Sequence, residues 1–484
     1  MKLKSLFITA CSFLAVAPVL AAPTAYLPMG SDPMLEYQVD TLFSLSTGTP
    51  ARKPYRMSDI QDALRYIRLS EPDLHRAISD KINVYEQRDA ITRQGAKVML
   101  KSGEVDKLAN DRGNQSDEYL QLDFEGIWRG SENTLMQVGI GYRAHSTKLI
   151  PYNTFVAYSL GNVQFDLGYR EHWFSPFKHF GQVFSTNAKP SPSVSLSLVS
   201  PLRNWWNFDV ELFYSELDHV NEGFYFQDKM VSGTPQLAGS RFSIEPIDGW
   251  TLGVNRMMQF GGGPRPVSFS DVVKAFFDPA GQDNRGLTGG TFDSELGDQW
   301  ATLTSTHQFT DWYNAEVYFE YGGEDTSGHK NYRFGNLVMN AGVFLPRLTA
   351  DSSLRYEYSN MHSRWYINNL YFKNGNTIDG FVVGNFAADN RLFGDDNPLK
   401  AHVLEWVQQS NSHSHWRVKY TTTYNENDFE REDVGLEFDY QHRAHELEVV
   451  RSERWQNKQA EAKLALGKDV FGENYAWLSL NVYW

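Results

Sequence analysis

The amino-acid sequence predicts an all-β protein: a transmembrane antiparallel β-barrel of about 18 strands with a small N-terminal helical bundle. Three observations support this fold class. Segments with an apolar residue at every second position recur along the chain, and aromatic residues make up 14% of it. After residue 22 no run approaches the roughly 20 apolar residues that a membrane-spanning helix needs.

Residues 1–22 are predicted to be a signal peptide that is cleaved after export. Two lysines stand at the start, an apolar run follows, and Ala21 and Ala22 are the small residues expected at the cleavage site. Cys11 offers the alternative of an acylated lipoprotein, although the apolar run continues past it. With cleavage near Ala22 the mature chain has no cysteine, so we expect no disulfide framework.

Residues 23–91 are expected to form a periplasmic helical region. A short helix around residues 34–43 precedes two amphipathic helices. Ser58 and Gln61 have the spacing of a capping box at the start of the second helix, and Pro72 opens the third. Because these helices need a surface to pack against, we expect them at the barrel mouth and not as a free-standing domain.

From residue 92 to residue 484 the apolar period changes from helical to two, and we expect this part to be the barrel. The last ten residues show the alternation most clearly. Successive side chains of a strand face opposite sides, so one set faces lipid and the other the lumen. The expected lipid-facing set at the C-terminus is Ala476, Leu478, Leu480, Val482 and Trp484.

Counting such segments gives 18 or 19 strands. An even number is expected, so one counted strand should fail, and the weakest are 96–101 and 459–467. A soluble sandwich or propeller would also alternate, but no repeat of about 40 residues marks propeller blades. The clearest further segments are 120–128, 136–144, 163–169, 208–214, 313–321, 337–345, 354–358, 416–424, 434–440 and 446–450.

The connections between these segments are of two kinds. Some are tight, as at Gly161-Asn162, whereas others run for twenty residues or more. Barrels of this class have short periplasmic turns and long outer loops, and long loops are often functional. The long connections are residues 172–190, 218–239, 261–296 and 361–400.

Composition and motifs exclude several functions. The formal net charge of -14 argues against nucleic acid as a partner. No nucleophile elbow, zinc-protease motif or phosphate-binding loop occurs, so no catalytic residue and no cofactor are expected. His413 with His415, and the stretch 282–286, resemble metal sites too weakly to predict a metal ion.

The densest unusual stretch is R-M-M-Q-F-G-G-G-P-R-P-x-S-F-S-D at residues 256–271, followed by Asp283-Asn284. It resembles the signature of the capsule-assembly Wzi family. Residues 323–328, G-E-D-T-S-G, are similar to another segment of that family, and residues 172–176 resemble a third loosely.

The resemblance implies an eighteen-stranded barrel in the outer membrane of a Gram-negative bacterium, with loops that occlude its outer mouth. It implies a lectin-like role in binding or organising capsular or other exported polysaccharide, without catalysis. Outer-membrane lipid is the other expected partner, and we expect a monomer. A porin-like channel remains an alternative, as does an outer-membrane enzyme using Ser268, Ser270 or His329.

Polysaccharide contacts would come from the motif residues. Arg265 could fork onto a carboxylate or a pair of hydroxyls, aromatic rings could stack on sugar faces, and carboxylates and amides could accept hydrogen bonds from hydroxyls. Alternatively, Arg265 pairs with Glu324 or Asp325 and only fixes the loop. The candidate residues are Arg265, Phe269, Asp271, Asp283, Asn284, Glu324 and Asp325.

Overall fold

The structure is a computed structural model of the chain. It describes residues 21–46, 49–103, 107–265, 267–280, 296–328, 330–362, 365–368, 375–390, 399–411, 413–425, 443–456, 458–470 and 472–484.

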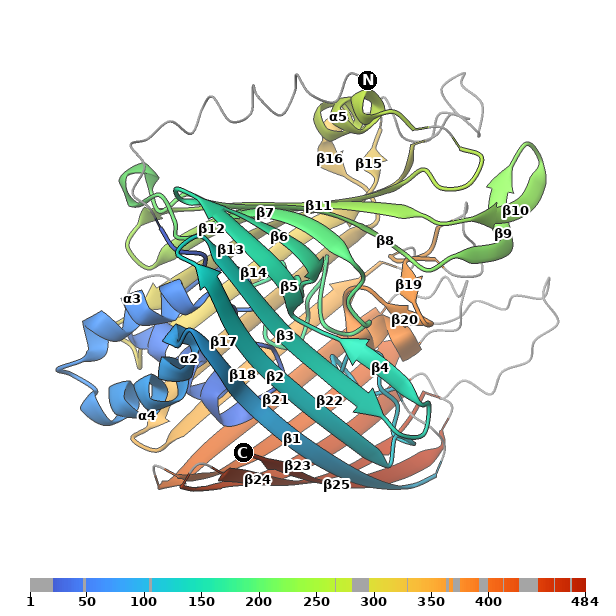
Figure 1. Cartoon of the computed structure of the whole chain (residues 1–484). Helices are drawn as coiled ribbons and strands as arrows, with labels where there is room; N and C mark the ends of the chain where they lie inside the picture. The colour runs from blue at the N-terminus through green and yellow to red at the C-terminus, as the bar shows by residue number, and fades with distance from the viewer. Residues whose placement is uncertain are drawn as a thin grey trace.

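The fold is a closed antiparallel barrel of 18 strands, which confirms the predicted fold class (Figure 1). Each strand pairs with its neighbours in the ring, and β1 closes on β25 with Gly95 opposite Tyr483. A further strand, β4 (Lys148–Pro151), pairs only with β3. The ring consists of β1 (Asp89–Ser102), β2 (Leu120–Ser131), β3 (Thr134–Arg143), β5 (Thr154–Leu160), β6 (Val163–Tyr169), β7 (Ser193–Leu198), β8 (Asp209–Glu216), β11 (Gln236–Ile247), β12 (Trp250–Phe260), β13 (Gly297–Phe309), β14 (Ala315–Glu324), β17 (Leu337–Thr349), β18 (Ser352–Met361), β21 (Leu399–Asn411), β22 (Ser414–Asn425), β23 (Arg443–Trp455), β24 (Lys458–Lys468) and β25 (Asn474–Tyr483).

Both segments expected to be the weakest strands belong to the ring. Residues 96–101 lie in β1 and residues 459–467 in β24, and these two strands pair with β25 on its two sides. The expectation that one of them fails is therefore wrong. The extra strand expected at 434–440 falls outside the described residues, and the ring closes without it.

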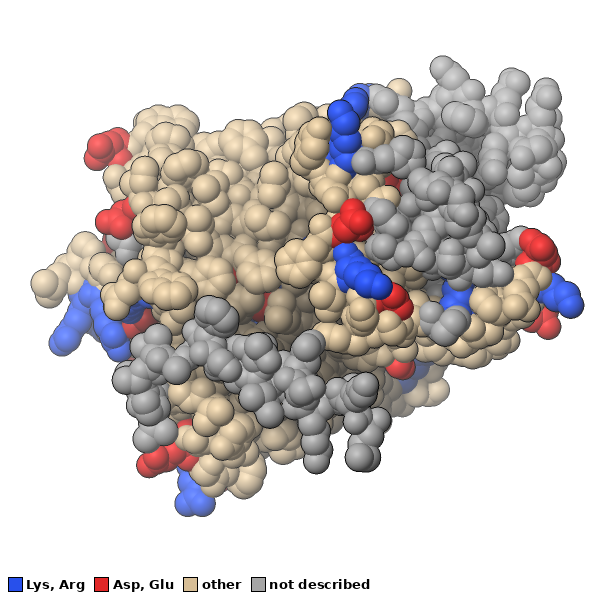
Figure 2. Space-filling view, turned by 90° about the horizontal axis from the view of Figure 1, so that it is seen from above, with Lys and Arg blue, Asp and Glu red and all other residues tan. Residues whose placement is uncertain are grey.

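The outer surface of the ring is apolar. On β25, Leu478, Leu480 and Val482 are exposed, whereas Ser479 and Asn481 are buried inside, as the alternation predicts. Figure 2 shows a broad area of barrel wall almost free of charged side chains; the Lys, Arg, Asp and Glu in this view lie at its edges and in a small group near the centre. Exposed tryptophans stand near the strand ends on the side of the N-terminal helices, where a lipid–water interface favours them. They are Trp128, Trp205, Trp206, Trp312, Trp416, Trp455 and Trp484.

The N-terminal helices α2 (Pro33–Leu45), α3 (Met57–Ile67) and α4 (Pro72–Ile82) lie at one end of the barrel, followed by the 3-10 turn η1 (Asn83–Glu86) (Figure 1). Their apolar stripes form one core with wall residues such as Leu135 and Phe155. Among the described residues, no helix is both long and apolar enough to cross a bilayer.

The predicted capping box on α3 does not form. The helix begins at Met57, and its N-cap, Arg56, makes no side-chain capping bond. The Ser58 hydroxyl instead donates to the Val199 carbonyl at 2.7 Å, and the Gln61 amide donates to Glu86. Contact with the barrel wall has therefore replaced a local cap.

The long connections lie at the opposite end from these helices. They carry α5 (Phe269–Phe277) and three hairpins, of which β9–β10 and β19–β20 lie at the right of Figure 1. Turns at the helical end are short, apart from η2 (Arg203–Trp205), which follows β7. The hairpins are β9 (Val220–Phe226) with β10 (Lys229–Gly233), β15 (Thr326–Ser327) with β16 (Lys330–Phe334), and β19 (Thr377–Ile378) with β20 (Phe381–Val382); η6 (Phe386–Asn390) follows the last.

Candidate functional site

Two of the long outer connections fold into the lumen and form what we call the plug: residues 170–192 with the described part of 365–390. Trp173, Phe174 and Phe177 are fully buried there. Asn255 of β12 donates to the Phe174 carbonyl at 2.9 Å. The plug is therefore fixed to the wall through its backbone.

Further hydrogen bonds join the plug to β14 and β18 of the wall. The Ser175 hydroxyl donates to Glu320 of β14 at 2.9 Å. The backbone N–H groups of Lys178 and His179 donate to the two oxygens of Glu357 on β18, at 2.8 and 2.9 Å. A buried carboxylate that accepts two N–H groups holds the loop rigidly.

The plug builds a hydrophobic core on one side of the lumen. Phe177 meets the ring of Tyr318 edge-on at 4.7 Å, and Phe180 stacks on Phe386 at 5.6 Å. Inward residues of β8, β11–β14, β17, β18 and β21 complete this core. They include Phe213, Leu237, Met257, Trp300, Tyr318, Val338, Phe344, Met361 and Val403.

The N-terminal segment reaches the plug from the other mouth of the barrel. Lys53 and Trp173 exchange backbone hydrogen bonds at 3.1 and 3.0 Å, as in an antiparallel bridge. Arg52 pairs with Glu211 of β8 at 2.5 Å, and the same carboxylate meets Arg170 of the plug at 2.8 Å. Because buried charges require partners, this network holds segment, wall and plug in one arrangement.

The other side of the lumen contains a polar cavity of about 270 Å³, which we call the shaft. Its wall is formed by β21–β25 and β1, and its lining along β25 extends from Tyr475 to Tyr483. Lys107 and Asp469 line it near the outer strand ends, and Glu36 of α2 lines it at the helical end. The shaft therefore follows the lumen over most of its length.

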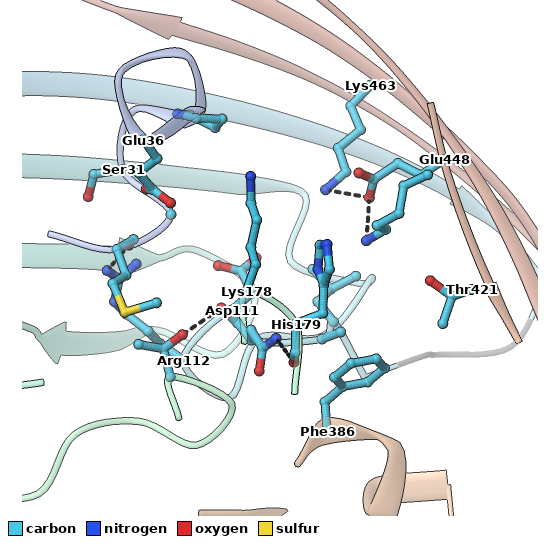
Figure 3. A pocket seen from close by; sticks show the side chains of 18 of the residues that line it. Ser31, Glu36, Asp111, Arg112, Lys178, His179, Phe386, Thr421, Glu448 and Lys463 are labelled. Carbon is cyan, nitrogen blue, oxygen red and sulfur yellow. Dashed lines mark hydrogen bonds and ion pairs between the residues drawn. The ribbon is translucent and has the colours of Figure 1, made fainter. Parts of the chain in front are cut away.

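Figure 3 shows side chains from separate parts of the chain around the shaft. Lys178 and His179 come from the plug, Glu448 and Lys463 from the wall, and Glu36 from α2. Glu448 receives three cations: Lys463 at 2.8 Å, Arg417 at 3.1 Å and Lys419 at 3.4 Å. The wall of the shaft thus presents a dense group of charges to its interior.

Aromatic rings interrupt these charges. Trp477 is buried in the wall, with the Lys463 ammonium 4.8 Å from its ring centre. The Arg93 guanidinium stacks on Tyr483 at 3.7 Å. Ring faces therefore lie beside charged groups in the lining, as they do in sites for ligands with both polar and apolar faces.

The protonation of groups outside the strands follows from their surroundings. Burial raises the pKa of Glu36 to about 7, against the lowering effect of Lys178. Burial lowers the pKa of His179 to about 4, so its imidazole is neutral at pH 7. Burial opposes ionisation of Asp111, but Lys97 and two guanidinium groups outweigh it and lower the pKa of that carboxyl to about 2.

The residues predicted from the sequence motif lie elsewhere, at the outer end of β12 and on α5. Arg256 donates to the Phe276 and Ala275 carbonyls at 2.6 and 2.7 Å, which anchors the end of α5 to the strand. Three glycines with positive φ, 261–263, turn the chain between them. The motif therefore encodes a strand, a tight turn and a docked helix.

Individual candidates differ in accessibility. Arg265 is buried, and Phe269 is 63% exposed. Asp271 accepts from the Ser268 N–H and hydroxyl at 3.0 and 2.6 Å and closes a capping box on α5. Asp271 thus has a structural role at the helix start.

Glu324 and Asp325 lie at the outer end of β14. Glu324 is buried, and the Asp325 N–H donates to the Gln299 carbonyl at 3.0 Å. Asp283 and Asn284 lie outside the described residues, as does His329. Within the described part, none of the motif candidates lines the shaft.

Sequence reasoning missed the shaft residues, although a signal was present. Arg417 and Lys419 occupy the inward set of the predicted strand 416–424, and Glu448 that of the predicted strand 446–450, which pairs with it. Charged residues on the lumen faces of adjacent strands mark a polar interior. Their grouping with α2 and the plug depends on contacts between distant residues, which a linear motif cannot show.

Neither weak metal motif gains support. His415 is buried and stacks on Tyr37 at 6.2 Å, and stretch 282–286 lies outside the described residues. Among the described His, Cys, Asp and Glu residues, no group of three is placed to hold a metal ion.

The closed ring, its apolar belt and its interior filled by its own loops define the class of protein: an outer-membrane β-barrel with a plugged lumen. The family model of the capsule assembly protein Wzi matches residues 92–475. The chain belongs to this family.

Two further comparisons agree with this assignment. A solved structure of Wzi, an outer-membrane carbohydrate-binding β-barrel involved in group 1 capsule assembly in Escherichia coli, has a TM-score of 0.66 with 15% identity. The alignment covers 96% of this chain and 99% of that one, and it shows a shared fold. An uncharacterised 55.8 kDa protein of the Klebsiella pneumoniae cps region is 34% identical over 96 residues, which span 19% of this chain and only 18% of that relative.

A third similarity is weaker. The Pseudomonas aeruginosa protein OccK11 has a TM-score of 0.45 with 12% identity, over 82% of this chain and 95% of that one.

Proposed function

We propose that this protein binds and organises capsular or other exported polysaccharide at the outer surface of the outer membrane, without a catalytic step. The observation that carries the proposal is the plug, which replaces an open pore with a rigid outer face in a chain of the capsule-assembly family. The similarity to the carbohydrate-binding E. coli barrel supports the same reading.

The proposal includes the path and orientation of the chain. Residues 1–22 direct export and are removed, and the helical region faces the periplasm. The barrel sits as a monomer in outer-membrane lipid, with the long connections outside. The position of α2–α4 and of the hairpins at opposite ends supports this orientation (Figure 1).

We place the outer polysaccharide contact on α5. Phe269, Val273 and Phe277 are exposed at intervals of four residues, so they share one side of the helix, and Tyr332 of β16 is also exposed. Aromatic faces stack on the apolar side of sugar rings. Arg265, Asp271 and Glu324 then position this surface, and contact through Asp325, Asp283 and Asn284 remains part of the proposal.

The test is deletion of the gene and staining of surface polysaccharide, with complementation by variants. The wild-type gene should restore retention, and the double variant Phe269→Ala/Phe277→Ala should not. Trp205→Ala is a matched control, because this exposed aromatic lies at the opposite end of the barrel. Unchanged retention in the deletion strain would refute the proposed function.

A porin-like channel is the second candidate, and the shaft is the observation that favours it. Conduction would require the shaft to pass α2, whose Glu36 lies at its helical end. Single-channel recording of the purified protein decides between the two. We expect a small conductance or none, and a large steady one would favour the channel.

Catalysis is the least supported alternative. The Ser268 hydroxyl donates to Asp271 within the helix cap, which gives it a structural role. Alanine at Ser268 or Ser270 should leave polysaccharide structure unaltered, as judged by chemical analysis of the surface material.

A further inference from the structure

We propose that the shaft is a second carbohydrate site, which takes an uncharged saccharide unit, such as a chain end or branch, from the outer side. This inference rests on the proposed function and names where and what the protein binds. It assigns a binding role to residues of β21–β25 that the motif did not include.

The position of the shaft fits a ligand that enters from outside. Thr423 and Glu446 line it near the outer ends of β22 and β23, and Lys107 and Asp469 lie at the same level. The lining then continues inward to Tyr483, and α2 lies beyond. The volume of about 270 Å³ is close to the lower limit, roughly 300 Å³, of known small-molecule sites. One or a few sugar units, but no folded polymer, would fit.

The lining offers the contacts that sugars need. Sugar rings have apolar faces and a rim of hydroxyls, and the shaft supplies rings such as Trp477 and Phe386 beside Thr421 and Asn481. In Figure 3 Phe386 and Thr421 lie on the same side of the shaft as Glu448 and His179. Stacking faces and hydrogen-bonding groups therefore occur within one cavity.

Some polar groups of the lining have no protein partner. The Nε1–H of Trp477, the Nε2 amide of Gln121 and the Oδ1 atom of Asn481 are buried and make no hydrogen bond within the described part of the chain. All three residues are less than a tenth exposed. Unpaired buried polar groups cost about 1–3 kcal/mol each, so native proteins pair almost all of them. These three groups beside one cavity are therefore available to a polar ligand.

The charges of the lining favour an uncharged ligand. Among the described residues, ten Lys or Arg and nine Asp or Glu line the shaft, so positive and negative charges are nearly balanced. The cations of the wall are already engaged: Glu448 holds Lys463, Arg417 and Lys419. A hydroxyl can donate to one member of such a pair and accept from the other, whereas a sugar carboxylate would compete with Glu448.

The test uses full-length protein purified in detergent. The probes are oligosaccharides obtained by mild acid hydrolysis of the surface polysaccharide of the source strain, separated by anion exchange into uncharged and acidic fractions. Thr421→Trp fills the shaft opposite Glu446 of β23 without removing a charge. Thr422→Trp is the matched control, because its side chain shares the lipid-facing set with Trp416 and Tyr420.

We expect the uncharged fraction to bind wild-type protein and Thr421→Trp to weaken that binding at least about tenfold, a cost of 1.4 kcal/mol. Thr422→Trp should bind like wild type. Trp477→Phe keeps a ring but removes the unpaired donor, and should weaken binding about two- to tenfold. If Thr421→Trp fails to fold, Trp477→Phe decides alone.

The outcomes separate this inference from the proposed function. If wild-type protein retains intact polysaccharide but neither Thr421→Trp nor Trp477→Phe alters oligosaccharide binding, the shaft is not a site and the function stands. Binding of the acidic fraction alone would overturn the uncharged ligand. If wild-type protein binds neither polysaccharide nor fragments, the proposed function fails, and this inference fails with it.

Discussion

The two sides of the lumen differ sharply although one kind of wall builds both. Along β13, β14 and β18 the inward positions include Trp300, Tyr318 and Met361, which pack against the plug. Along β22–β24 the inward positions include Arg417, Glu448 and Lys463, which face the shaft. The lipid-facing set is apolar on both sides. The inward residues are therefore large and apolar where the plug packs against the wall, and charged where the wall faces the shaft.

The two sides of the lumen therefore have different roles: one holds the plug, and the other lines a polar cavity. The hydrophobic side holds the outer loops in place through burial of large side chains, together with hydrogen bonds from the plug to Glu320 and Glu357. The polar side depends on paired charges and hydrogen bonds, which are costly when a partner is lost but can be shared with a polar ligand. The following changes test this contrast, in order of decreasing expected effect.

The largest effect is expected for Phe177→Ala on the hydrophobic side. Loss of a buried phenyl group that packs on Tyr318 should destabilise the plug by about 3–5 kcal/mol. Protease cleavage within 170–192 and single-channel conductance should both increase. Phe319→Ala, on the outer surface of the same wall, should alter neither. An intact, protease-resistant plug in Phe177→Ala would show that burial does not hold it.

On the polar side, Glu448→Gln should lower barrel stability by roughly 3 kcal/mol, because three cations lose their shared anion. Thermal unfolding in detergent measures this effect. Glu453→Gln, at an exposed carboxylate of the same strand, is the control. Equal unfolding temperatures for all three proteins would mean that the charges of the shaft are well solvated.

Arg265→Ala tests the motif loop, which lies apart from the shaft. Removing this buried guanidinium should loosen the loop by about 2 kcal/mol and weaken polysaccharide retention. Limited proteolysis of residues 261–296 and staining of whole cells measure the two effects. If neither changes, the motif has neither the structural nor the binding role given to it here.

The smallest effect concerns Glu36, where the shaft meets α2. Because the folded protein raises its pKa from 4.5 to about 7, the folded state holds a proton that the unfolded chain releases. The resulting stabilisation is complete below pH 4.5 and is lost as the pH rises through 7. Glu36→Gln should therefore reduce the loss of stability between pH 5 and pH 8. Asp73→Asn, at an exposed carboxylate of α4, should not.

The barrel could be predicted from sequence because its signal is local. The alternation at Leu478, Leu480 and Val482 indicates which side of β25 faces lipid. The apolar stripe through Ile78 and Ile82 indicates which side of α4 is buried. The strand count was uncertain only where charged residues weaken the alternation, as in β24.

The interior could be predicted only in part. Four long connections and the motif stand out in the sequence, but the contacts of the plug join residues more than a hundred positions apart, such as Ser175 with Glu320. The motif located α5, and the structure adds that Asp271 closes a capping box with Ser268 at the start of this helix. The shaft has no linear signature, since its lining comes from the whole length of the chain.

The bridge between Lys53 and Trp173 has a mechanical consequence. One of its partners belongs to a loop that enters from the outer mouth, and the other to a segment that enters from the helical mouth. An outward pull on residues 170–192 is therefore resisted by the N-terminal segment as well as by the flanking strands. A load applied to the plug is shared with α2 and α3, so the helices act as an anchor at the other end of the barrel.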